Sequence, residues 1–210
     1  GPILQEEYKS NVGQLPIPVV YGMTWGELAQ MINGEGWLKA VKDGCTLTVI
    51  PCENYTHQTL TTLPCNPSPN IRTMRAVYLY SSLCFFENTL VSVGRGTDHP
   101  FESFGSPYLK DAEGYDYIFI PKSTDGAANP QYEGVECYGL DLSSASEDKI
   151  RDEGIDLNYL IDAYNEVAGR YPKEDFWGKK NDKGNYWIDL LSGSEELRKM
   201  IEEGKTASEI

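Results

Sequence analysis

The chain has 210 residues and a formal net charge of −14, with 40% hydrophobic and 24% charged residues. This composition is typical of a folded globular protein of one or two domains. The negative charge argues against sequence-independent binding of nucleic acid and against docking on anionic lipid, because both need a basic surface. No apolar run approaches the length that crosses a bilayer, and no signal peptide opens the sequence. We therefore expect no nucleic-acid partner and no membrane insertion.

The first half of the sequence carries two clear helix starts. Thr24 followed by Glu27 is a capping box, which predicts a helix that ends at Gly34. Thr73 is the predicted N-cap of a second helix. The other elements expected in this half are, in order, a strand at 46–50, a loop at 53–70, the helix at 74–83, a short strand at 90–93 and a glycine-containing loop at 94–107.

The second half combines two strand patterns with a helical end. Residues 115–120 are rich in aromatic and β-branched residues and predict a strand, and a second strand is expected at 132–142, with a glycine at each end of its core. Apolar residues recur with a helical period over 157–167, and shorter helices are expected at 186–191 and 195–203. The predicted fold class is α+β, with a small, mostly antiparallel sheet, flanking helices and a helical C-terminal third.

The cysteines and histidines do not predict a metal centre. There are five cysteines without a C-x-x-C pair, and neither His57 nor His99 has ligand spacing relative to them. We expect the cysteines to be small buried hydrophobic residues, although a disulfide stays open. No metal and no cofactor are expected.

Arg95 is the first candidate binding residue. Residues 71–110 hold four basic and three acidic residues, so this block is not acidic, unlike the chain as a whole. Arg95 lies between Gly94 and Gly96, which permit a tight turn and a close approach of a ligand to the backbone. The planar guanidinium suits a carboxylate. The alternative is a structural ion pair of Arg95 with Glu87 or Glu102.

Two further candidates lie in the first 70 residues. Asn70 follows two prolines on a rigid loop, and its amide offers both a donor and an acceptor, as sugar recognition requires. Tyr21 and Gly22 come just before the N-terminus of the first predicted helix. The alternatives are a turn or cap role for Asn70 and a plain capping turn at residues 21–24.

Several ordered motifs together resemble the second half of the YbbC-like/NamZ family of bacterial exo-β-N-acetylmuramidases, glycoside hydrolases of peptidoglycan recycling that were long catalogued as a domain of unknown function. The resemblance is dense over residues 1–110 and looser beyond. The motifs are Pro16-Ile17-Pro18, Tyr21-Gly22-Met23-Thr24, Leu47-Thr48-Val49-Ile50-Pro51, Pro67-Ser68-Pro69-Asn70, Glu87 with Thr89, Ser92-Val93-Gly94-Arg95-Gly96-Thr97 and Pro100-Phe101-Glu102.

The resemblance implies that residues 1–210 form a single C-terminal, auxiliary domain of a two-domain enzyme. Its Rossmann-like N-terminal domain, with the catalytic glutamate, would lie outside this chain, so no catalytic residue is expected here. That absent domain is then the expected partner, and the isolated chain is expected to be inactive. The link to peptidoglycan implies an extracytoplasmic, periplasmic location.

The resemblance also assigns roles toward a glycan that contains N-acetylmuramic acid. Arg95, flanked by Gly96, would receive the lactyl carboxylate. Asn70 and Thr97 would bind hydroxyl or N-acetyl groups, Tyr21 would line the pocket, and Glu102 or Glu87 would orient Arg95. Two other functions stay open, namely a non-catalytic glycan-binding module and a structural or dimerising domain without a ligand.

Overall fold

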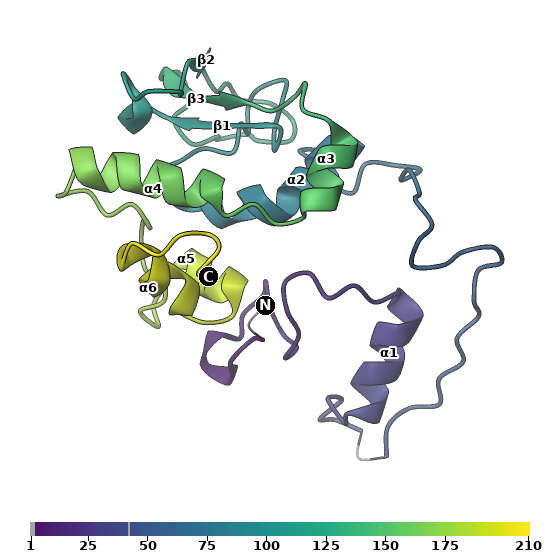
Figure 1. Ribbon diagram of the computed structural model, residues 1–210. Coiled ribbons are helices and arrows are strands. Elements are labelled where there is room, and N and C mark those ends of the chain that lie inside the picture. The colour runs from purple at the N-terminus through teal and green to yellow at the C-terminus, as the bar shows by residue number, and fades with distance from the viewer. Residues whose placement is uncertain (1–2, 42) are drawn as a thin grey trace.

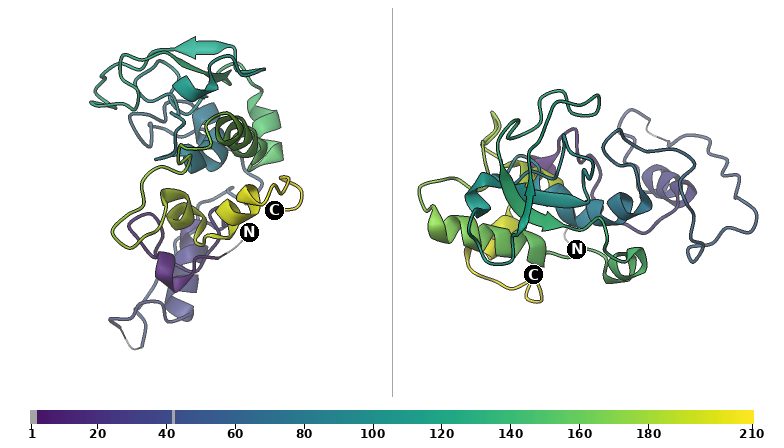
Figure 2. Two further views of the ribbon diagram at one scale, coloured as in Figure 1. Left: turned by 90° about the vertical axis from the view of Figure 1, so that its left-hand side faces the viewer. Right: turned by 90° about the horizontal axis from the view of Figure 1, so that it is seen from above.

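The computed structural model describes residues 3–41 and 43–210. Helices and a small sheet are arranged in layers, with the sheet on one side of α2, α3 and α4, and with α5 and α6 on the other side (Figures 1 and 2). The elements are, in chain order, η1 (Glu6–Tyr8), α1 (Trp25–Gly34), α2 (Met74–Leu83), η2 (Cys84–Phe86), β1 (Ser103–Ser106), η3 (Pro107–Leu109), β2 (Tyr117–Phe119), β3 (Cys137–Asp141), α3 (Glu147–Glu153), α4 (Asn158–Arg170), α5 (Trp187–Ser192) and α6 (Glu196–Glu202).

The sheet has three antiparallel strands in the order β1-β3-β2. Gly105 of β1 lies opposite Gly139 of β3. A Cβ atom on Gly139 would lie 1.8 Å from the carbonyl oxygen of Phe104, so this crossing has no room for a side chain. The sheet and the surrounding helices confirm the predicted α+β class.

Local capping signals located the helices correctly. Thr24 accepts a hydrogen bond from the backbone N–H of Glu27 and the Glu27 carboxylate accepts one from the N–H of Thr24, so the predicted capping box starts α1. Thr73 caps α2, whose bounds agree with the prediction. The predicted helices at 157–167, 186–191 and 195–203 correspond to α4, α5 and α6. The short helix α3, capped by Ser146, was not predicted.

The strand predictions were less accurate. Residues 46–50 form no strand, and Leu47, Val49 and Ile50 are exposed. A strand needs a hydrogen-bonded neighbour, and none of the described residues supplies one. Residues 90–93 contribute only a single bridge, between Ser92 and Gly105, and β1 lies inside the predicted loop at 94–107.

The hydrophobic core is drawn from the second part of the chain. All buried members of the main cluster lie between Ala76 and Ile201. Phe104 of β1 stacks on Phe86, with ring centroids 4.8 Å apart, and Leu160 of α4 is fully buried. The core therefore connects the sheet with the helical layer beneath it.

Residues 3–41 and 43–70 pack little against this core. Their main buried contribution is a small cluster in which Leu4 and Tyr8 pack on Leu190 of α5, and Leu28 of α1 is also buried. Helix α1 and the irregular stretch that follows it extend away from the layers (Figure 1). Trp25 is 82% exposed and Ile50 is 87% exposed.

The same arrangement corrects the expectation for the cysteines. Cys84 and Cys137 are buried, and burial raises the pKa of each thiol to about 12. Cys45, Cys52 and Cys65 are exposed, because they lie in the irregular stretch that no core covers. All five are free thiols, so the disulfide that the sequence left open is not formed.

Candidate functional site

Two glycines set the backbone on either side of Arg95. Gly94 and Gly96 have φ values of 72° and 83°. A Cβ atom would lie 2.5 Å from the Ser103 hydroxyl oxygen at Gly94, and 2.6 Å from the Lys122 carbonyl oxygen at Gly96. A side chain at either position would therefore force the turn apart. The turn therefore fixes the backbone position of Arg95.

The Arg95 side chain lies between an acidic and an aromatic partner. Its Nη2 donates to Oε1 of Glu87 over 2.6 Å, and its Cζ lies 4.8 Å from the centre of the Phe101 ring. Tyr80 packs on Phe101, with its ring centre 5.1 Å from that of Phe101. The Arg95 side chain is 36% exposed and that of Glu87 is 20% exposed. Arg95 makes no other hydrogen bond within the described part of the chain, so part of its guanidinium remains available to an anion.

Glu87 joins two cavities. One, of about 200 Å³, is lined by Glu87, Asn88, Val91, Ser92, Val93, Arg95, Gln131 and Trp187. The other, of about 520 Å³, includes Tyr21, Tyr80 and Glu87 in its wall. Tyr21 and Arg95 thus line two cavities that share Glu87, although they come from distant parts of the sequence.

Glu102 has a different role from Glu87. It is only 5% exposed, accepts a hydrogen bond from the Thr73 hydroxyl over 2.6 Å, and pairs with Arg75 at 3.2 Å. It therefore anchors the start of α2. Of the two acidic partners that the sequence allowed for Arg95, the structure selects Glu87, and the prediction that Glu102 orients Arg95 is wrong.

The side chains of Asn70 and Thr97 both donate hydrogen bonds to backbone carbonyl groups. Asn70 is 3% exposed, its amide nitrogen donates to the Gly126 carbonyl over 2.7 Å, and its side-chain oxygen has no partner among the described residues. The Thr97 hydroxyl donates to the Gly94 carbonyl over 2.7 Å and accepts from the His99 N–H. Neither residue lines the cavities at Glu87.

Sequence reasoning missed Gln131 and Trp187. Both line the smaller cavity with Arg95. Gln131 belongs to the connection between β2 and β3, and its amide nitrogen donates to the Thr89 carbonyl over 2.8 Å. The same connection reaches the Arg95 turn, where the N–H of Lys122 donates to the Gly96 carbonyl over 2.9 Å. No motif or spacing in the sequence predicts that these residues lie beside Arg95, because their position depends on how the connection between β2 and β3 folds back.

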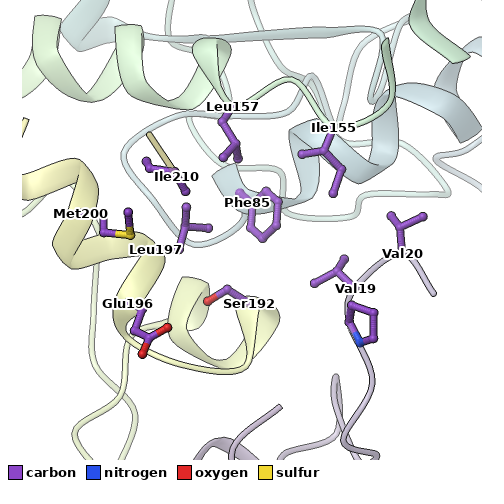
Figure 3. Close-up of a pocket in the computed structure, with 11 residues that line it drawn as sticks. Val19, Val20, Phe85, Ile155, Leu157, Ser192, Glu196, Leu197, Met200 and Ile210 are labelled. Atoms are coloured by element: carbon purple, nitrogen blue, oxygen red, sulfur yellow. The ribbon is translucent and has the colours of Figure 1, made fainter. Parts of the chain in front are cut away.

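A third cavity, of about 530 Å³, has a different character. Aliphatic and aromatic side chains point into it from the segment at residues 18–20, η2 and α6 (Figure 3). Its residues include Val19, Phe85, Leu197, Met200 and Ile210, and its one charged residue is Glu196. This apolar, acid-flanked cavity offers no cation to an anionic ligand, and it holds none of the predicted site residues.

The described residues contain no group of three or more His, Cys, Asp or Glu side chains placed to hold a metal ion. Within residues 3–41 and 43–210, no helix has the length and apolarity needed to span a bilayer.

Comparison with known proteins identifies the family. Residues 78–210 match the C-terminal family model of the exo-β-N-acetylmuramidase NamZ, and residues 1–75 match its N-terminal family model. The peptidoglycan β-N-acetylmuramidase NamZ of Bacillus subtilis is 33% identical over 222 residues, which cover 100% of this chain and 50% of that protein. The chain belongs to the NamZ family.

Solved structures agree with this assignment. The crystal structure of a DUF1343 family protein from Bacteroides fragilis matches with a TM-score of 0.86 and 49% identity, covering 100% of this chain and 55% of that one. A second DUF1343 protein from the same organism is 22% identical and shares the fold, with a TM-score of 0.73 over 97% of this chain and 54% of its own. The chain thus spans about half the length of each of these proteins.

The two NamZ family models meet at α2. The N-terminal match ends at residue 75 and the C-terminal match begins at residue 78. Tyr21 and Asn70 fall in the N-terminal match, whereas Glu87 and Arg95 fall in the C-terminal match. The larger cavity at Glu87 is accordingly built from both.

Proposed function

We propose that this chain is the substrate-binding part of an exo-β-N-acetylmuramidase that releases N-acetylmuramic acid from peptidoglycan fragments, and that Arg95 receives the lactyl carboxylate of this sugar. The observation that carries the proposal is the partly exposed Arg95–Glu87 ion pair at the wall of a cavity. Membership in the NamZ family supplies the substrate class.

The geometry around Arg95 favours an acidic ligand. The described contacts use only one nitrogen of the guanidinium, Nη2, and a planar guanidinium can bind two carboxylates through different edges. Glu87 and the Phe101 ring hold the group in one orientation before the ligand arrives. Less side-chain entropy is then lost on binding.

We assign the catalytic carboxylate to the part of the NamZ proteins that this chain does not span. Hydrolysis of a glycosidic bond uses a pair of carboxylates on either side of the bond. In the 200 Å³ cavity, the only carboxylate is that of Glu87, which is already paired with Arg95. We therefore expect the 210-residue chain to bind the sugar without cleaving a chromogenic β-N-acetylmuramide, and turnover by the purified chain would contradict this assignment.

The exposed apolar side chains of residues 12–63 support a partner within the same protein. They include Val20, Trp25, Ile50 and Leu60, and they lie in the region that matches the N-terminal NamZ model. Exposed apolar side chains mark an interface where they form a continuous surface. We propose that the remainder of that N-terminal domain covers it, and that the assembled enzyme works outside the cytoplasm, in the periplasm, where peptidoglycan is located.

Calorimetric titration with N-acetylmuramic acid tests the role of Arg95. A hydrogen bond to a charged group contributes about 1.5–3 kcal/mol, so Arg95→Ala should weaken binding by about 10–100-fold. Arg72→Ala is the matched control, because the Arg72 side chain donates only to the carbonyl of Pro69. N-acetylglucosamine, which lacks the carboxylate, should bind equally to the wild-type chain and to Arg95→Ala. Unchanged affinity of Arg95→Ala for N-acetylmuramic acid would contradict the proposal.

A further inference from the structure

Trp187 presents an unused hydrogen-bond donor beside the Arg95–Glu87 pair. It is the first residue of α5 and lines the 200 Å³ cavity. Its indole nitrogen is buried and has no hydrogen-bond partner among the described residues. A buried donor left unpaired destabilises the folded state, so a native structure that retains one calls for an explanation.

The backbone around this cavity is held in place. Asn88 has a φ of 62°, and Gly178 approaches so closely that a Cβ atom there would lie 2.0 Å from the Asn88 carbonyl oxygen. The N–H of Leu90 donates to the carbonyl of Phe176 over 2.9 Å. These contacts give the cavity a fixed wall beside Trp187 before any ligand binds.

The cavity combines apolar and polar surfaces at close range. Val91 and Val93 are 1% and 4% exposed and form its apolar side. Trp187 offers an N–H donor, and Gln131 has its amide nitrogen bonded to Thr89, which leaves its side-chain oxygen as an acceptor. The residues that line the cavity therefore include an unpaired donor, an amide oxygen and aliphatic side chains.

The volume limits what this group can be. Ligand pockets that enclose a whole small molecule measure roughly 300–1,000 Å³, and a water molecule occupies about 30 Å³. A cavity of about 200 Å³ accommodates a substituent of a larger ligand. An acetamido group has a methyl for the valines, a carbonyl oxygen for the indole N–H and an N–H for the glutamine oxygen.

We infer that the cavity beside Arg95 is the subsite for the N-acetyl group of the sugar, with Trp187 as the residue that distinguishes acetylated from deacetylated ligands. The inference rests on the proposed function for the identity of the sugar. It assigns the N-acetyl group to Trp187 and Gln131 rather than to Asn70 or Thr97, which do not line this cavity.

Titration of the wild-type chain with three sugars, followed by the indole N–H resonances in ¹H–¹⁵N spectra, tests the inference. The sugars are N-acetylmuramic acid, muramic acid without the acetyl group, and N-acetylglucosamine without the carboxylate. The Trp187 signal is assigned by its loss in Trp187→Phe. Both acetylated sugars should shift this signal, and muramic acid should bind about tenfold more weakly than N-acetylmuramic acid without shifting it.

The variant Trp187→Phe removes the donor while it keeps an aromatic ring. It should lose about tenfold in affinity for N-acetylmuramic acid and keep its affinity for muramic acid. Trp25→Phe is the control, because Trp25 is 82% exposed and lines none of the three cavities described above. If Trp187→Phe fails to fold, the comparison of the three sugars with the wild-type chain still decides.

The outcomes separate this inference from the role of Arg95. Equal binding of acetylated and deacetylated muramic acid, with both weakened by Arg95→Ala, would overturn the subsite and leave the carboxylate role intact. Equal binding of N-acetylglucosamine and N-acetylmuramic acid, with the Trp187 signal shifted by both, would support the subsite and contradict the carboxylate role. A site filled only by water, with no sugar bound, would contradict both.

Discussion

Arg95 and Trp187 illustrate two ways in which one side chain becomes available for binding. The Arg95 charge is partly neutralised by Glu87, yet most of its donors face no described partner. The Trp187 N–H is buried and has no partner among the residues that the structure describes. In both cases a ligand meets donor groups that no described residue occupies.

Glu27 combines capping with an ion pair on the surface of α1. Its carboxylate accepts from His57 at 3.0 Å and from the N–H of Thr24 at 2.8 Å. The hydrogen bond from His57, followed by that from the Thr24 backbone, lowers the pKa of Glu27 from 4.5 to about 2. A lowered pKa means that the folded state favours the ionised form. The stabilisation is therefore fully present above pH 4.5 and is lost as the pH falls through about 2.

The His57→Ala variant tests this coupling. The titration midpoint of Glu27, followed by the ¹³C shift of its carboxyl carbon, should be near 2 in the wild-type chain and move toward 4.5 in the variant. His99→Ala serves as the control, since His99 does not contact Glu27 in the described hydrogen-bond network. An identical midpoint in wild type and His57→Ala would show that the histidine does not hold the carboxylate.

Among the elements, the sheet depends on two facing glycines. Gly105 and Gly139 let β1 and β3 approach at a point where a Cβ atom would collide with backbone. Backbone atoms cannot move aside as a flexible side chain does, so a methyl group there separates the strands. The separation would also reach the Arg95 turn, because Ser92 bridges to Gly105.

Gly139→Ala should lower the free energy of unfolding by about 3 kcal/mol. Gly169→Ala is the matched control, because Gly169 lies in α4 with open space around the added methyl. Alanine favours a helix, so this control should raise the free energy of unfolding by up to about 1 kcal/mol. Urea denaturation measures both, and equal stability of Gly139→Ala and wild type would refute the close approach.

For the entire chain, the distribution of the core predicts which part folds independently. The main cluster lies between Ala76 and Ile201, whereas residues 3–41 and 43–70 add mainly the small cluster at Leu4, Tyr8 and Leu190. The NamZ family models divide the chain at nearly the same place, between residues 75 and 78. That residues 1–210 form a single domain stays a prediction.

A fragment of residues 70–210 should keep a cooperative thermal transition in circular dichroism. It retains the Thr73 cap of α2 and the whole main core. A fragment of residues 1–136 is the control, and it should show no such transition because it lacks β3, the central strand of the sheet. Loss of cooperativity in the 70–210 fragment would mean that the first part of the chain stabilises the core more than its buried contacts indicate.

Features with a local physical cause were predicted well from the sequence. The caps at Thr24 and Thr73 are hydrogen bonds between residues three apart, so α1 and α2 begin where predicted. The Glu87–Arg95 pair lies within one turn-rich segment and was among the expected alternatives. Local geometry determines each of these, and the printed sequence contains all the residues involved.

Features that depend on partners distant in the sequence are determined only by the tertiary structure. Residues 46–50 have a strand pattern but no neighbouring strand, whereas β1 forms inside a predicted loop because β3 pairs with it. Glu102 pairs with Arg75 and not with Arg95 for the same reason, because folding places the start of α2 next to Glu102. Trp187, Gln131 and Arg95 line one cavity because remote segments of the chain contact one another. No periodicity or spacing along the sequence encodes these contacts.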